Sequence, residues 1–119
     1  MRYMLLIWSN AQSWDGMSDA EREALVRGHA QLSADLELSG ELVHAGGLAD
    51  EAESTTVQVT ADDEIEATDG PFAEAKEHLA GYYVVDVPDR ATAVSIAARI
   101  PDAKHVAVEV RPVVTPPLH

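Results

Sequence analysis

MRYMLLIWSN, residues 1–10, is the segment that says most about the architecture of the chain. Its apolar residues run almost without a break, which is typical of a central β-strand buried on both faces. Side chains alternate along a strand, so each face receives three of them: Tyr3, Leu5 and Ile7 on one side, and Met4, Leu6 and Trp8 on the other. The sequence therefore predicts a sheet that needs a cover on both faces.

Two helices are predicted to cover one of these faces. The first begins at Ser18, which forms a capping box with Glu21, and ends at Gly40, a residue suited to the left-handed position after a helix. The second is capped by Asp89 and ended by Pro101. Apolar residues recur at helical spacing on the inner face of each helix: Leu25, Leu32 and Leu36 on the first, and Ala93, Ile96, Ala97 and Ile100 on the second.

The remaining strands are predicted from β-branched and alternating segments. Residues 9–17 are expected to form a polar loop, and residues 55–60 and 64–68 a hairpin arm near a sheet edge. Without that arm the order is βαββαβ, the ferredoxin-like plan of an α+β protein with an antiparallel sheet. Strands are expected at residues 3–8, 41–48, 81–87 and 106–111, followed by a tail from about residue 113.

Length and charge limit the classes of protein to consider. The 119 residues fit a single domain, 1–119. The formal net charge of -13 and the scattered cations argue against binding to nucleic acid. No segment approaches the roughly twenty apolar residues of a membrane span, and cysteine is absent. A cytoplasmic protein that contacts neither membrane nor nucleic acid is therefore expected.

The second apolar sheet face has no cover within the predicted elements. Both the first strand and the strand of Tyr82, Tyr83, Val84 and Val85 are apolar on both sides. An exposed apolar face of this size favours association. The sequence therefore predicts a homodimer that packs sheet to sheet.

A second informative stretch is TDGPFAEAKEHLAGYYVVDV, residues 68–87. Its first half combines turn residues and charges, and Pro71 suits the first position of a short helix. Together with RYMLLIW near the start and VEVRP near the end, it resembles the DGPF-type branch of the YCII-related family. The resemblance implies a single YCII-related domain that forms a dimeric α+β barrel of ferredoxin-like subunits.

The function of that family is poorly defined. Wider relatives have a proposed His-Asp pair in a cleft, with the histidine in a helix context similar to GHAQL here, which contains His29. Some DGPF-type relatives occur with extracytoplasmic-function sigma factors. The resemblance thus implies either a small enzyme or a regulatory module.

His29 and Asp69 are the candidate catalytic residues. His29 lies on the apolar stripe of the first helix, where an imidazole can act as a general base. The alternative is a core histidine with a satisfied hydrogen bond. Asp69 opens the DGPF run and is a candidate partner for His29, the pairing being a hypothesis, but it could equally be a turn aspartate bonded to a nearby backbone amide.

Three further residues of the DGPF run are candidates for a pocket. Phe72 is the only phenylalanine and could fill the core or form a pocket wall. Glu74 falls in the first turn of the expected short helix, where the helix dipole favours an anion. Lys76 could hold an anionic group, or it could be an exposed partner of Glu77. No motif predicts a metal site or a cofactor.

Two functions remain open from the sequence. The first is a cofactor-independent enzyme that uses His29 and Asp69 in a proton-transfer or lyase-like step on a small molecule. The second is a non-catalytic module that binds a ligand or a protein partner, in which both residues are structural. The two differ in whether His29 and Asp69 meet at a pocket, directly or through one water.

Overall fold

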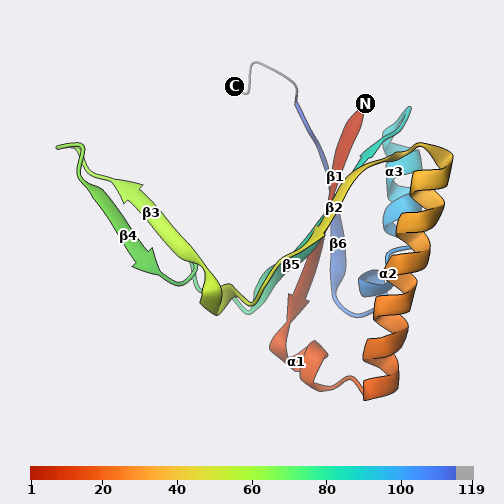
Figure 1. Cartoon of the computed structure of the whole chain (residues 1–119), viewed down its shortest axis with the longest axis horizontal. Helices are drawn as coiled ribbons and strands as arrows, with labels where there is room; N and C mark the ends of the chain where they lie inside the picture. Colours follow the sequence, from red (N-terminus) through yellow and green to blue (C-terminus); the bar gives the residue numbers. More distant parts are fainter. Residues whose placement is uncertain (115–119) are drawn as a thin grey trace.

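The computed structural model describes residues 1–114 of the chain, and the prolines at 116 and 117 in the expected tail lie outside this range. It contains one four-stranded sheet, one two-stranded sheet, and helices α2 and α3 as its main helices (Figure 1). Along the chain the elements are β1 (Arg2–Asn10), α1 (Ala11–Asp15), α2 (Asp19–Ser39), β2 (Leu42–Gly47), η1 (Glu51–Glu53), β3 (Thr55–Val59), β4 (Ile65–Asp69), β5 (Glu77–Asp86), α3 (Arg90–Ala97), η2 (Pro101–Lys104) and β6 (Ala107–Pro112).

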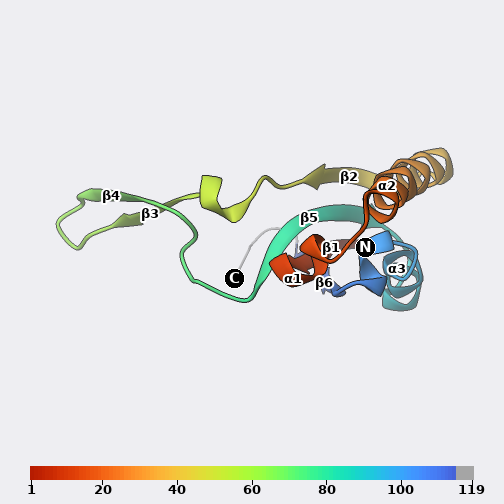
Figure 2. The same ribbon diagram turned by 90° about the horizontal axis from the view of Figure 1, so that it is seen from below.

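The main sheet has the strand order β2-β5-β1-β6, and each neighbouring pair is antiparallel. This arrangement confirms the predicted α+β, ferredoxin-like plan. Helices α2 and α3 lie on one side of the sheet, while in residues 1–114 no α-helix covers the other side (Figures 1 and 2). Within residues 1–114 the sheet is open and does not close into a barrel. The sheet-to-sheet homodimer stays a prediction.

The core lies between the sheet and the two helices. One side of β1 contributes Tyr3, Leu5 and Ile7, and all three are buried. They pack with Tyr83 and Val85 of β5. Six of the seven apolar residues predicted on the inner faces of the helices are buried in this core: Leu32, Leu36, Ala93, Ile96, Ala97 and Ile100. The seventh, Leu25, is only partly buried.

Helix α2 begins and ends as its sequence predicts. The Ser18 side chain accepts a hydrogen bond from the Glu21 amide, and the Glu21 carboxylate accepts one from the Ser18 amide. At the other end Gly40 has φ 80°, the left-handed conformation that glycine adopts without a steric penalty. These two local signals set where α2 begins and ends, and therefore which of its side chains lie against the sheet.

Three local expectations were wrong. Residues 9–17 are not a simple loop, because Asn10 accepts a hydrogen bond from the Ser13 amide and caps the short helix α1. No helix begins at Pro71, since residues 70–76 are irregular and β5 begins at Glu77. The expected strand start at Gly81 was therefore four residues late, because the strand continues through residues whose charge argued for a loop.

The predicted hairpin arm is present and consists of β3 and β4. These strands pair with each other from Thr55 opposite Asp69 to Val59 opposite Ile65, as a sheet separate from the main one. The arm projects away from the body on the side opposite the helices (Figures 1 and 2). Among the described residues, no helix is both long and apolar enough to cross a membrane.

Candidate functional site

His29 is held by α2 at the edge of the core. Leu32 and Leu36, one and two turns further along the helix, are buried against the sheet. Leu25 and His29 occupy the same stripe nearer the start of α2 but are only partly buried. The helix therefore brings the imidazole to a place where the packed core opens into a cavity.

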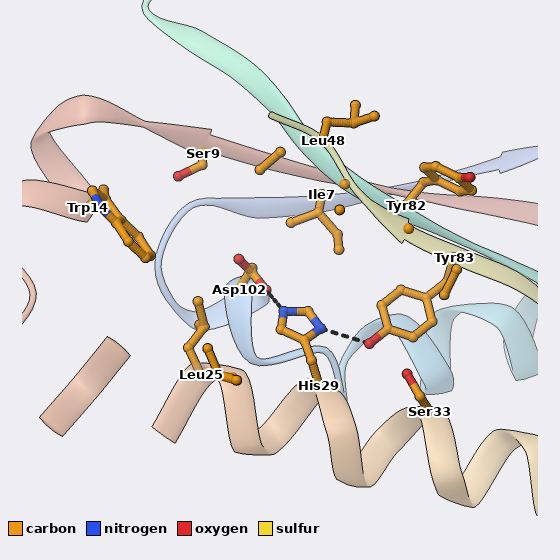
Figure 3. Close-up of a pocket in the computed structure, with 16 residues that line it drawn as sticks. Ile7, Ser9, Trp14, Leu25, His29, Ser33, Leu48, Tyr82, Tyr83 and Asp102 are labelled. Carbon is orange, nitrogen blue, oxygen red and sulfur yellow. Dashed lines mark hydrogen bonds and ion pairs between the residues drawn. The ribbon is translucent and has the colours of Figure 1, made fainter. Parts of the chain in front are cut away.

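Both ring nitrogens of His29 have protein partners. Nε2 lies 2.5 Å from Oδ1 of Asp102, and Nδ1 lies 2.7 Å from the Tyr83 hydroxyl (Figure 3). The His29 and Tyr83 rings are stacked, with centroids 5.8 Å apart. A carboxylate only accepts hydrogen bonds, so a neutral His29 carries its proton on Nε2 and donates it to Asp102. Nδ1 then accepts the hydrogen bond that the Tyr83 hydroxyl donates.

Asp102 reaches His29 from the η2 turn, which follows α3. Ile100 is buried in the core and anchors the start of this turn. Pro101 packs against Gly28 so closely that a Cβ atom at position 28 would lie 2.6 Å from the proline Cγ. The glycine thus permits the close approach of η2 to α2, and the Asp102 side chain is only 14% exposed.

Tyr83 comes from β5 and points toward the helices. It is 3% exposed, and burial raises the pKa of its hydroxyl above the ordinary value of 10. The negative charge of Asp102 raises the pKa further, whereas a hydrogen bond with Ser33 opposes these effects. Because the hydroxyl keeps its proton up to a higher pH, it remains a donor to His29.

These three side chains lie at a cavity of about 610 Å³ between α2 and the sheet (Figure 3). Apolar side chains, including Ile7, Leu25 and Leu48, form much of its wall. Glycines at positions 46, 47 and 81 leave room beside β2 and β5, and Gly81 approaches Gly46 so closely that an added Cβ would lie 2.9 Å from the Gly46 carbonyl oxygen. A mostly apolar cavity with a few converging polar groups is typical of a small-molecule site.

Trp14 of α1 lines the cavity at the end away from Tyr83 (Figure 3). The Arg22 guanidinium lies over its ring, 4.9 Å from the centroid, and Nη2 of Arg22 donates a hydrogen bond to the Trp14 carbonyl oxygen at 2.7 Å. These contacts hold α1 against the start of α2. The segment expected as a loop thus supplies an aromatic wall.

The structure does not bring Asp69 to His29 within one chain. Asp69 lies at the root of the arm, opposite Thr55 in the β3–β4 ladder. The next residue, Gly70, donates its amide hydrogen bond to the Ser54 carbonyl oxygen and accepts one from the Thr56 hydroxyl. The arm leaves the sheet on the side opposite α2, so the DGPF run is carried away from the histidine (Figure 1).

The other DGPF candidates are also outside the His29 cavity. Phe72 is 78% exposed, and Glu74 and Lys76 are exposed as well. A second cavity, of about 480 Å³, lies at the root of the arm, but it is lined by their neighbours Pro71 and Ala73 rather than by these three side chains. Within the described chain, the expected pocket of Phe72, Glu74 and Lys76 is therefore not formed around His29.

Sequence reasoning missed two members of the observed array. Alternation along β5 places Tyr83 on the same face as Val85, toward the helices, and this signal could have identified it. Asp102 gives no comparable signal, because it is 73 residues from His29 and follows a proline in an irregular connection. Across residues 1–114, no group of three His, Asp or Glu side chains could hold a metal ion.

Comparison with known proteins identifies the family of the chain. The family model for the YCII-related domain matches residues 1–116, almost the whole sequence. No curated protein matches the chain.

Proposed function

The chain belongs to the YCII-related family, and we propose that it is a cofactor-independent enzyme that moves a proton on a small molecule bound in the His29 cavity. The observation that carries the proposal is the continuous hydrogen-bonded array from Asp102 through His29 to Tyr83. All three residues line one cavity. Asp102 replaces Asp69 as the carboxylate of the pair.

His29 is the base of this array. As the bound molecule gives a proton to the Tyr83 oxygen, the Tyr83 proton moves to Nδ1 of His29. The resulting imidazolium has a proton on both nitrogens, and the Asp102 carboxylate stabilises its positive charge through Nε2. Return of the proton through Tyr83 to a different atom of the same molecule completes an isomerisation, and return to a leaving group completes an elimination.

The apolar surroundings favour this chemistry. The apolar wall of the cavity strengthens the interaction between the imidazolium and Asp102, whose side chain is only 14% exposed. Because the pKa of the Tyr83 hydroxyl is raised, its oxygen takes a proton from the bound molecule only as its own proton passes to Nδ1 of His29. After the array has accepted the proton, the positive charge lies on the His29 ring and is balanced by the Asp102 carboxylate.

The proposal is tested by hydrogen–deuterium exchange of carbon acids in D₂O, followed by proton NMR. The probes are small ketones and β-dicarbonyl compounds with acidic C–H groups. The wild-type chain is expected to accelerate exchange of at least one probe. His29→Gln, Asp102→Asn and Tyr83→Phe should each reduce this rate by roughly 10²–10⁴-fold, the usual contribution of general acid–base catalysis.

Asp69→Asn is the matched control, because it makes the same chemical change as Asp102→Asn at the root of the arm. It should exchange the probe at the wild-type rate. Full activity of His29→Gln would overturn the assignment of the base. Loss of activity in Asp69→Asn but not in Asp102→Asn would return the carboxylate role to the DGPF run.

A non-catalytic binding module is the second candidate. It is favoured by the fact that both ring nitrogens of His29 already have protein partners, as in a structural histidine. The resemblance to DGPF-type relatives would then suggest a ligand or protein partner in sigma-factor-linked regulation. A ligand that binds with the same affinity to wild type and to His29→Gln, without any exchange or turnover, would support this alternative.

We also propose that two copies associate through the open sheet face. This face carries Met4, Leu6 and Trp8 of β1 beside Tyr82 and Val84 of β5, as the pairing register requires. Of these, Leu6 is buried by its neighbours and the other four remain partly exposed. A second copy would remove this apolar surface from water.

A further inference from the structure

The β3–β4 arm is a two-sided ribbon with one apolar face. Directly paired residues share a face of a two-stranded sheet. The register pairs Val57 with Ala67 and Val59 with Ile65, so these four side chains lie together. Polar residues alternate with them and occupy the opposite face, where Gln58 pairs with Glu66 and Thr56 with Thr68.

The apolar face of the arm is uncovered in the single chain. Val57, Val59 and Ile65 are 60%, 62% and 75% exposed. Such a concentration of exposed aliphatic side chains marks an interaction site. An isolated two-stranded hairpin is also only marginally stable in water, so this arm needs a partner surface.

The extended shape of the chain is a further indication that the arm binds a partner. The radius of gyration of the described residues is 16.5 Å, whereas a compact chain of this length has a value of about 13–14 Å. The excess comes from the arm, which stands away from the sheet on its open side (Figures 1 and 2). The arm and the open sheet face therefore lie on the same side of the molecule (Figure 1).

A second copy of the chain fits both surfaces at once. In a dimer with a two-fold axis, the arm and the open sheet face of each copy both face the other copy. Each copy can then cover the apolar surfaces that the other exposes. The negative charge of the arm tip is also opposite in sign to two arginines on the open face. The arm tip carries Asp62, Asp63 and Glu64, while Arg2 and Arg111 lie at the end of the open face, in register beside Asp86 and Met4, and Arg111 also pairs with Glu109 of its own strand.

We propose that the arm is an intersubunit clasp: its apolar face packs on a second copy of the chain, and its acidic tip lies near the Arg2 and Arg111 end of that copy's open face. The clasp rests on the homodimer proposed above but is a separate contact. This contact gives the hairpin a function that is separate from the His29 site. It also explains why a strand pair with one apolar face projects away from the core of its own chain.

The test measures the dimer dissociation constant by sedimentation velocity over a dilution series. The test variant is Val57→Thr/Val59→Thr/Ile65→Thr, because threonine keeps the β-branched shape of the strand residues but removes apolar surface. The matched control is Gln58→Thr/Glu66→Thr on the polar face of the same strands. The test variant should weaken the dimer by roughly 100-fold or more, and the control by less than about threefold.

A measurement on the unmodified chain covers the case in which the variant misfolds. Amide hydrogen exchange of residues 55–69 should be slow in the concentrated wild-type dimer and should accelerate when the protein is diluted below the dissociation constant. Equal dissociation constants for test and control variants, with arm amides that exchange rapidly at every concentration, would overturn the clasp and leave the sheet-to-sheet dimer standing. A wild-type chain that is monomeric throughout would overturn both.

Discussion

Replacing Gly28 by alanine should disturb the His29–Asp102 pair without changing either side chain. The new Cβ would lie 2.6 Å from Cγ of Pro101, the residue that precedes Asp102. Carbon atoms in contact are normally about 3.5–4.0 Å apart. The proline ring cannot rotate away as a flexible side chain would. The η2 turn must therefore move away from α2 by about 1 Å, the difference between these distances.

Two opposing free energies determine the stability of this variant. In a helix interior alanine is more favourable than glycine by about 1 kcal/mol. Overpacking against Pro101 costs about 1–3 kcal/mol. The free energy of unfolding should therefore fall by roughly 0–2 kcal/mol. The geometric effect is larger, because an outward shift of about 1 Å takes the His29–Asp102 contact past the usual hydrogen-bond limit of about 3.2 Å.

Urea denaturation measures the first effect, and nitrogen NMR of the His29 ring measures the second. Ala30→Gly is the control, because Ala30 is exposed on the same helix and its replacement changes helix propensity without approaching Pro101. Adding Pro101→Ala to Gly28→Ala removes the obstructing Cγ and should restore the pair. If Gly28→Ala instead stabilises the chain by about 1 kcal/mol and leaves the His29 ring signals unchanged, the proposed constraint on η2 is refuted.

Three further predictions concern the site and the core. Burial raises the pKa of Tyr83, so the folded chain keeps a proton that the unfolded chain releases near pH 10. The free energy of unfolding should therefore fall as the pH rises from about 10 through the folded-state pKa of Tyr83. Denaturation of Tyr83→Phe over the same range should show a smaller fall, and identical slopes would contradict this. Gly81→Ala should destabilise the chain by roughly 1–3 kcal/mol, since its Cβ would lie 2.9 Å from a backbone oxygen of β2, and an unchanged urea midpoint would argue against that close approach. Leu36 is 1% exposed, so Leu36→Ala should lower the free energy of unfolding by roughly 2–5 kcal/mol. Leu38 is 92% exposed, so Leu38→Ala should change it by less than about 0.5 kcal/mol. Similar losses of stability in both variants would contradict the orientation of α2.

The fold could be predicted because its signals are local. The capping box of Ser18 and Glu21 and the left-handed Gly40 mark the two ends of α2. The alternation of the first strand separates Leu5, in the core, from Met4, on the open face. The short helix α1 was missed because its five residues include one large apolar side chain and give no helical periodicity.

The site could be predicted only in part, because it depends on contacts between distant segments. Helical spacing places His29 on the inward stripe of α2, and the structure has it there. The choice of Asp69 as its partner followed a conspicuous motif, whereas the carboxylate observed at His29 is Asp102. That contact depends on the approach of η2 to Gly28, which no spacing or composition in the sequence encodes.

We propose that Asp102 and Tyr83 hold His29 in one tautomer as the base of a proton-transfer array. The measurement that tests it most directly is a long-range proton–nitrogen NMR spectrum of the His29 ring, taken at a pH where the imidazole is neutral, in wild type and in Asp102→Asn. We expect a wild-type proton on Nε2 and an unprotonated Nδ1 that accepts from Tyr83, with this preference reduced in Asp102→Asn. A proton on Nδ1, or rapid averaging of the two nitrogens in the wild-type chain, would show that Asp102 and Tyr83 do not hold His29 in this tautomer.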